Sequence, residues 1–229
     1  MKERPIIFSG PMVRAILEGR KTQTRRVVKP QRKNMVYDLS GAWVDPGGTI
    51  WGPGPYLKVP VRHVDDTFDD GIIDRVFCPY GPVGTRLWVR ETWAVPVEYD
   101  DTAPRDIPQD VPVQYAVESM ALNGREGAIR SDCRGRWRPS IHMPRWASRI
   151  LLEVEDVRLE RVQDISDLDA LAEGIQVIGR TEVNDLSRGK FRHAFRALWD
   201  SINAKRGHGW DKNPWVWVVQ FRVVNAQEA

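Results

Sequence analysis

The chain has 229 residues, of which 28% are charged and 41% hydrophobic, and its net charge is +3. A chain of this size and mixture can bury a substantial core as one large domain or two small ones. No apolar run approaches the roughly 20 residues that span a bilayer, and no signal-peptide hydrophobic region follows the first residues, so a membrane partner is not expected.

The two cysteines, Cys78 and Cys133, lie far apart and lack the CxxC spacing. Their pattern argues against a disulfide scaffold and against a thiolate zinc site, so we expect a reduced, cytoplasmic protein. The four histidines share no i,i+3 or i,i+4 pairing, and no spacing of acidic residues supports a metal site. Neither a metal nor another cofactor is therefore expected.

The N-terminal segment predicts a strand over 5–8 followed by a short helix. Pro11 suits a first helical position because its missing N–H costs nothing there. Ile16 and Leu17 continue an apolar face at helical spacing, and Gly19 can take the left-handed conformation that ends a helix.

The turn after this helix carries four cations and two hydroxyls within seven residues, 20–26. It places Lys21 and Thr24 where an ammonium and a hydroxyl can be aimed at one spot. The flanking arginines suit a phosphate or a carboxylate. The alternative interpretation of this turn is a solvated basic loop.

Two long stretches, about 29–83 and 95–147, predict insertions made of hairpins and loops. The first is rich in Gly, Pro and Asp, and the second holds a short strand over 113–117. The first does not read as a separate core, and we predict a single domain over 1–229. Between the insertions, 85–94 predicts a strand.

The last third of the chain is more regular. A strand is predicted over 150–159, and Ser166 with Asp169 forms a capping-box pattern at the start of a short helix. A second helix follows over about 188–203, and a terminal strand over 215–221. The side chains expected to face the core are Leu168, Leu171 and Ala172 in the first helix and Phe191, Phe195, Leu198, Trp199 and Ile202 in the second. Several strands with few helices predict an α+β protein built on a small closed or partly closed barrel that carries the two insertions.

Aromatic and cationic side chains alternate in the second insertion, at 134–139 and at 145–146. Such interleaving suits single-stranded nucleic acid, because bases stack on indole rings while cations contact the phosphates. The same residues can instead be arginines stacked on tryptophans within the fold. Both interpretations stay open from the sequence.

Four segments of the chain resemble, in the same order, the motifs of ASCH domains, a branch of the PUA-like β-barrel superfamily. They frame nearly the whole chain, leave the two insertions unmatched, and are most similar to the large ASCH proteins often carried by phages and prophages. Thr85 stands where the second motif usually has aspartate. The segments are Gly19–Arg26, Gly84–Trp93, Asp164–Ile175, and Trp199–Ile202 with Pro214–Val218.

This resemblance implies a PUA-like barrel that binds RNA, single-stranded nucleic acid or a modified nucleoside in a cleft. One small bacterial ASCH branch is an amidohydrolase that removes the acetyl group from acetylcytidine with a lysine, a threonine and a glutamate. The lysine and threonine match Lys21 and Thr24, and Glu173 is the aligned candidate for the glutamate. Some ASCH relatives are identified as ribonucleases, so the resemblance implies a ribonuclease as a further alternative.

The residues themselves are compatible with amide hydrolysis. Thr24 can act as the nucleophile if a base takes its proton, and Lys21 can be that base only if its pKa falls well below about 10.4. Glu173 or Glu91 can then protonate the leaving amine or position a water.

Glu91 lies on an otherwise apolar strand face, where a buried acid needs a partner. Its structural alternative to a catalytic role is an ion pair with an arginine such as Arg26. We expect one cleft lined by Lys21, Thr24, Arg26, Glu91 and Glu173. The residues expected to contact the ligand are Arg20, Thr22, Arg25, Arg26, Arg90 and Trp93.

Overall fold

The computed structural model describes residues 3–29, 35–37, 43–44, 56–63, 68–119, 133–176 and 189–224. The chain divides into two compact units, and each is assembled from separated stretches of sequence. Unit 1 comprises Met1–Lys21, Arg86–Glu153 and Arg222–Ala229, and unit 2 comprises Thr22–Thr85 and Val154–Phe221.

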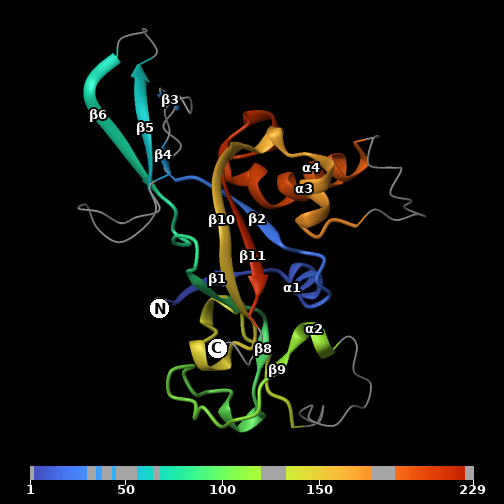
Figure 1. Cartoon of the computed structure of the whole chain (residues 1–229). Coiled ribbons are helices and arrows are strands. Elements are labelled where there is room, and N and C mark those ends of the chain that lie inside the picture. The colour runs from blue at the N-terminus through green and yellow to red at the C-terminus, as the bar shows by residue number, and fades with distance from the viewer. Residues whose placement is uncertain are drawn as a thin grey trace. The chain divides into compact units, whose positions relative to one another are not determined.

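A five-stranded sheet has the order β1-β7-β10-β11-β2, with β1 and β2 at its two ends (Figure 1). The predicted α+β class is confirmed by this sheet and the helices. The sheet is open, and the closed barrel stays a prediction. The strands are β1 (Glu3–Ile7), β7 (Arg86–Arg90), β10 (Leu151–Arg161), β11 (Trp215–Val223) and β2 (Gln23–Val27).

In unit 1, β1 runs parallel to β7, with Glu3 opposite Arg86 and Ile7 opposite Arg90. The chain then enters helix α1 (Gly10–Leu17), which has Ser9 at its N-cap and a proline in its first turn. Gly19 follows the helix with a φ of 71°, a left-handed conformation that favours glycine. The predicted strand, helix and glycine stop are all confirmed.

The second insertion has a small core of its own within unit 1. The strand predicted over 85–94 is interrupted at Glu91 and Thr92, and the chain resumes as β8 (Trp93–Ala94) paired with β9 (Gln114–Tyr115). The strand predicted over 113–117 is shortened because the chain turns at once into α2 (Ala116–Ser119). The buried core residues here are Trp93, Val95, Ile107, Met143 and Ala147.

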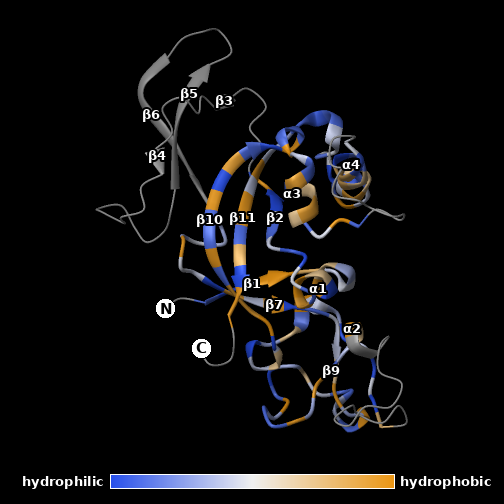
Figure 2. Cartoon of the chain, turned by 45° about the vertical axis from the view of Figure 1, so that its right-hand side comes forward, coloured by the Kyte–Doolittle hydropathy of each residue, from blue (hydrophilic) through white to orange (hydrophobic). Residues whose placement is uncertain are grey.

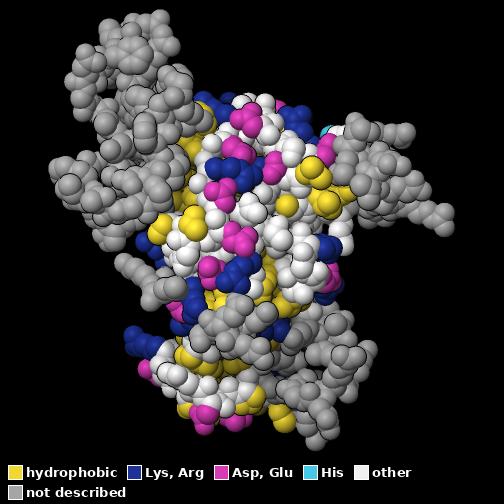
Figure 3. Space-filling view, viewed as in Figure 1, with side chains coloured by type: hydrophobic (Ala, Val, Ile, Leu, Met, Phe, Trp, Pro, Cys, Tyr) yellow, Lys and Arg dark blue, Asp and Glu magenta, His cyan; other side chains and the backbone are white. Residues whose placement is uncertain are grey.

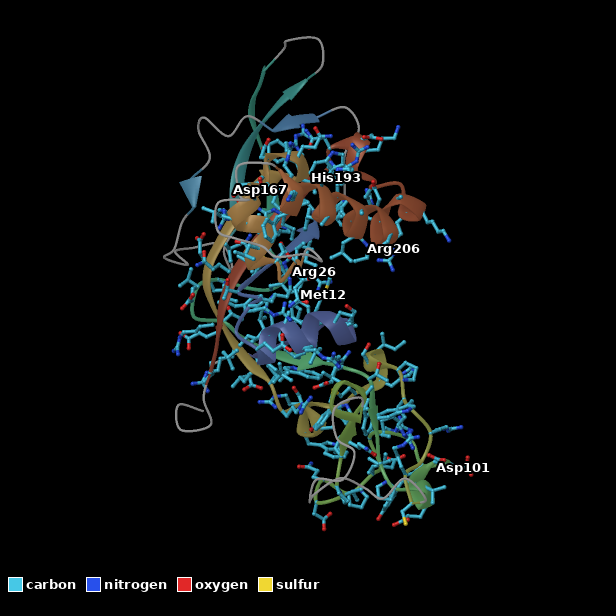
Figure 4. The ribbon with its side chains drawn as sticks, turned by 90° about the vertical axis from the view of Figure 1, so that its right-hand side faces the viewer. Met12, Arg26, Asp101, Asp167, His193 and Arg206 are labelled. Atoms are coloured by element: carbon cyan, nitrogen blue, oxygen red, sulfur yellow. The ribbon has the colours of Figure 1, made fainter. Side chains whose placement is uncertain are left out.

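In unit 2, α3 (Asp167–Ala172) packs against α4 (Lys190–Asn203), and Asp167 and His193 mark their first turns in Figure 4. The capping box at Ser166 is confirmed. The predicted inner face of α3 is wrong, because Leu168 and Leu171 are 64% and 40% exposed. This six-residue helix buries Ala170 instead, together with Glu173 just beyond its end.

The stripe predicted on α4 is confirmed for three aromatic side chains, Phe191, Phe195 and Trp199, which are buried. Ile202 is 40% exposed, and the buried residue in the last turn is Asn203, whose amide donates to the carbonyl of Trp199. The aromatic residues join Trp210 and the inner side chains of β11 in one cluster.

Hydrophilic and hydrophobic residues alternate along β10 and β11 in Figure 2. On β10 the buried positions are Leu152 and Val154, then Val157 and Leu159, so the alternation shifts by one residue in the middle of the strand. Over this part of unit 2, acidic and basic side chains intersperse on the surface in Figure 3. Arg158, for example, pairs with Asp156 and Glu160.

The first insertion contains a second sheet, in which β5 pairs with β3, β4 and β6. This agrees with the prediction of hairpins there. Its strands are β3 (Met35–Tyr37), β4 (Trp43–Val44), β5 (Tyr56–His63) and β6 (Phe68–Phe77). Short 3-10 helices cover Val97–Tyr99, Ser140–His142, Arg145–Ala147, Val162–Asp164, Ala204–Arg206 and Trp210–Lys212.

Candidate functional site

Lys21 is held by the turn that ends α1. The backbone N–H groups of Arg20 and Lys21 both donate to the carbonyl of Ala15, at 2.9 and 3.0 Å. The lysine is only 2% exposed, and its Nζ lies 5.7 Å from the centre of the Phe8 ring. The helix stop therefore fixes a buried ammonium against an aromatic face, a favourable cation–π arrangement. This is not the solvated loop that the sequence left open as an alternative.

The same part of unit 1 contains Glu91. The N–H of Phe8 donates to the carbonyl of Arg90 at 3.3 Å, so Phe8 lies beside the end of β7, where Glu91 follows. Glu91 is 1% exposed. Within unit 1, the aromatic partner of Lys21 and the buried carboxylate thus belong to neighbouring chain segments.

Glu91 forms an ion pair with an arginine, which is the alternative to a catalytic role that the sequence left open. Nε and Nη2 of Arg149 donate to the two carboxylate oxygens at 2.9 and 3.2 Å, a fork that fits a carboxylate. The guanidinium of Arg149 also stacks 3.9 Å from the centre of the Tyr115 ring. The backbone N–H of Glu91 donates to the sulfur of Met143. The buried carboxylate is thus fixed by a guanidinium that is itself stacked on Tyr115, and a fixed carboxylate is suited to orienting a ligand or a water.

The other predicted contacts of unit 1 differ in exposure. Arg20 is partly exposed and its Nε donates to Glu18 at 2.8 Å. Arg90 stacks on the Trp88 ring at 4.5 Å and donates to the carbonyl of Ile141. Trp93 is fully buried in the core of the second insertion.

Unit 2 contains a buried charge cluster around Arg25 on β2. Its side chain is fully buried and lies 3.0 Å from Glu160, 3.4 Å from Asp169 and 3.4 Å from Glu173. Glu173, the C-cap of α3, is 6% exposed, and Thr24 beside Arg25 is 3% exposed. The structure therefore brings two residues of the predicted site, Arg25 and Glu173, into contact.

The carboxylate of Asp169 is bound from several directions. It accepts hydrogen bonds from the hydroxyl and the backbone N–H of Ser166 and from the amide of Gln23, and it pairs with Arg158 at 3.1 Å. Burial alone would raise the pKa of Asp169. These hydrogen bonds and the charge of Arg25 outweigh burial and lower the pKa to about 2.

Because the pKa of Asp169 is lowered in the folded protein, the contribution of its carboxylate to the free energy of unfolding depends on pH. The contribution of ionised Asp169 is present above the unfolded-state pKa, near 4, and is lost as the pH falls through about 2. Because the side chain is partly exposed, we expect Asp169→Asn to lower the free energy of unfolding at pH 7 by about 1–2 kcal/mol. Urea unfolding of the wild type and of Asp169→Asn between neutral and acidic pH measures this difference. A difference in unfolding free energy that stays constant below pH 4 would contradict the lowered pKa of Asp169.

The remaining predicted residues also belong to unit 2. Thr22 is exposed, and its backbone bridges two segments, donating to the carbonyl of Ala172 at 2.9 Å and accepting from Phe221 at 2.8 Å. Arg26 is half-buried opposite Trp217 on the neighbouring strand β11. Burial raises the pKa of Tyr80, and the charge of Arg26 opposes that rise.

The five residues expected to line one cleft are distributed over both units. Lys21 and Glu91 belong to unit 1, and Thr24, Arg26 and Glu173 belong to unit 2. Sequence reasoning missed Arg149 and its stacking partner Tyr115, and it missed Gln23 and Arg158 beside Asp169. Arg149 and Gln23 lie 58 and 146 residues from the acids that they bind, so no local spacing could have indicated them.

The described residues contain no group of three or more histidine, cysteine or acidic side chains suited to a metal ion. In the same residues, no helix is long and apolar enough to cross a membrane. No family model, no curated protein and no solved structure matches this chain.

Proposed function

We propose that this protein is a PUA-like barrel protein of the ASCH family that binds RNA, single-stranded nucleic acid or a modified nucleoside, with Lys21 at the centre of the site. The observation that carries the proposal is the burial of Lys21, which is 2% exposed at the end of a glycine-stopped helix. Lysine is almost never fully buried unless it is paired, because desolvating an ammonium is costly, so burial here marks a polar site. A nearby buried carboxylate, Glu91, supports a polar site at this place.

Two further features support the proposal. Two of the segments that resemble ASCH motifs form defined local structures, a glycine stop at Gly19 and a capping box at Ser166. Of the arginines after Gly19, Arg20 and Arg26 are partly exposed and suit phosphate recognition, because arginine forks match its oxygens, whereas Arg25 is buried among carboxylates.

Lys21→Met tests this function, since methionine keeps most of the volume and removes the charge. We expect the dissociation constant for the best ligand in a panel of RNA, single-stranded DNA and nucleosides to rise roughly ten- to hundredfold. Lys29→Met is the matched control, because Lys29 is exposed on the same segment and should change binding little. Equal affinities for the two variants, with unchanged circular dichroism, would remove Lys21 from the site.

A second candidate function is hydrolysis of an acyl group on an acetylcytidine-like nucleoside. It is favoured by the burial of Thr24 and Glu173, and by the Arg25 guanidinium that lies 3.4 Å from the Glu173 carboxylate. A positioned carboxylate and a hydroxyl are two of the groups that acyl transfer needs. With acetylcytidine as the substrate, release of cytidine that is lost in Thr24→Ala and in Lys21→Met would establish the enzyme, and no release by the wild type would exclude this activity. Shortened RNA would instead indicate a ribonuclease.

A further inference from the structure

A cavity of about 450 Å³ lies in the second insertion of unit 1, and none of the residues assigned above to the proposed site lines it. It is open to solvent and lies between the loop at 101–104 and the segment 136–139. Asp101, labelled in Figure 4, lies on the first of these loops. Pockets of this size accommodate small organic ligands.

The cavity wall carries two guanidinium groups, those of Arg136 and Arg138, which form no ion pair with the residues that the structure describes. Nη2 of Arg136 donates to the backbone carbonyl of Asp100 at 2.5 Å. Arg138 donates to the backbone carbonyls of Thr102 at 3.0 Å, of Asp100 at 3.3 Å and of Tyr99. In each of these contacts the guanidinium donates to a backbone carbonyl and not to a carboxylate. The two cations are therefore held in place without a carboxylate in direct contact, which suits an anionic ligand.

Two acidic residues, Asp100 and Asp101, lie near the two arginines of the cavity, and neither forms an ion pair with them. The carboxylate of Asp100 accepts the backbone N–H of Arg136 at 2.9 and 3.2 Å. Asp101 is exposed at the rim, and His142 lines the wall. Arg138 is 6% exposed, so its charge acts from behind the surface, whereas Arg136 is exposed and can touch a ligand.

An indole ring completes the wall. Trp137 lines the cavity and remains partly exposed, while the Arg134 guanidinium stacks 4.4 Å from the centre of its ring. Most tryptophans of this chain whose side chains are described are buried, so a rigidly held, accessible indole is unusual here. Such a ring offers a stacking surface for a nucleobase.

We infer that this cavity binds one nucleotide of a single-stranded nucleic acid, with the base against Trp137 and the phosphate at Arg136. The inference rests on the proposed function, since it adds a second contact for the same class of ligand. The interpretation of 134–139 as arginines stacked within the fold is also correct for Arg134 and Trp137. Internal stacking and ligand binding are compatible because the stack keeps the indole at the cavity wall.

The test is the affinity and salt dependence of a labelled oligouridylate, measured by fluorescence anisotropy. We expect Trp137→Ala to weaken binding roughly tenfold and Trp137→Phe to restore most of it. Arg136→Gln should weaken binding and reduce the slope of log affinity against log salt by about 0.7. Arg105→Gln is the charge-matched control: this side chain is 87% exposed in the same insertion, pairs with Asp106, and should change nothing.

The outcomes separate the two proposals. Weaker binding in Lys21→Met with wild-type binding in Arg136→Gln and Trp137→Ala overturns the cavity and leaves the proposed function standing. The reverse pattern supports the cavity and overturns the role of Lys21, and no binding by the wild type overturns both. If uridine monophosphate competes as well as the oligomer, the ligand of the cavity is a free nucleotide and not one nucleotide of a strand. Competition by polyglutamate at equal charge would exclude base stacking.

Discussion

Replacing Arg25 by alanine is expected to cost about 3–5 kcal/mol of unfolding free energy, because it removes a fully buried cation from the carboxylates packed around it. The Arg25 side chain is fully buried and contacts Glu160, Asp169 and Glu173, of which Glu173 is itself almost fully buried. Urea unfolding, followed by circular dichroism, measures the loss.

Arg196→Ala provides the control for Arg25→Ala. Arg196 also belongs to unit 2 and pairs with Asp211 at 3.0 Å, but its side chain is 44% exposed and its partner's is 82% exposed. An exposed ion pair of this kind contributes about 0–1 kcal/mol. If both variants lose the same small amount, then the charges around Arg25 are solvated and the cluster does not stabilise the fold.

Trp93→Ala should cost a similar amount, about 3–5 kcal/mol, through the cavity that it leaves in the second insertion. Trp93 is fully buried, meets Trp146 edge-on at 6.1 Å, and lies under the Arg138 guanidinium at 5.5 Å. Denaturation monitored by tryptophan fluorescence, with limited proteolysis of the insertion, measures the effect.

Two further variants, Trp93→Phe and Trp137→Ala, serve as comparisons for Trp93→Ala. Phenylalanine refills part of the space, so its cost should be smaller than that of alanine. Trp137 is partly exposed, so its removal should leave the fold nearly unchanged. A proteolysis pattern of Trp93→Ala identical to that of the wild type would show that the insertion does not depend on this core.

The secondary structure could be predicted where local chemistry decides it. Gly19 after an apolar helix, and Ser166 with Asp169 before another, indicate where helices stop and start, because capping depends on neighbouring residues. The faces of α3 were predicted wrongly, since six residues are too few for spacing to fix which side is buried. Leu168 is exposed there, whereas Ala170 is buried.

The candidate site could be predicted only in part, for a similar reason. Lys21 and Glu91 were identified from the turn after a helix and from a carboxylate on an apolar strand face. The identity of the partner of Glu91 depends on tertiary structure, because Arg149 lies in a distant segment whose sequence shows no pattern linking it to β7. Likewise, the break of the predicted strand at Glu91 and Thr92 has no glycine or proline to indicate it.

The sheet order has a consequence for synthesis of the protein on the ribosome. β2, near the start of the chain, pairs in antiparallel register with β11, so Val27 lies opposite Val216 and Gln23 opposite Gln220. The backbone groups of β2 that face β11 therefore have no strand to pair with until almost all of the described chain has been synthesised. Long-range pairing of this kind slows folding and leaves a strand edge exposed meanwhile. A cell that makes this protein must keep the edge of β2 from pairing elsewhere until β11 emerges.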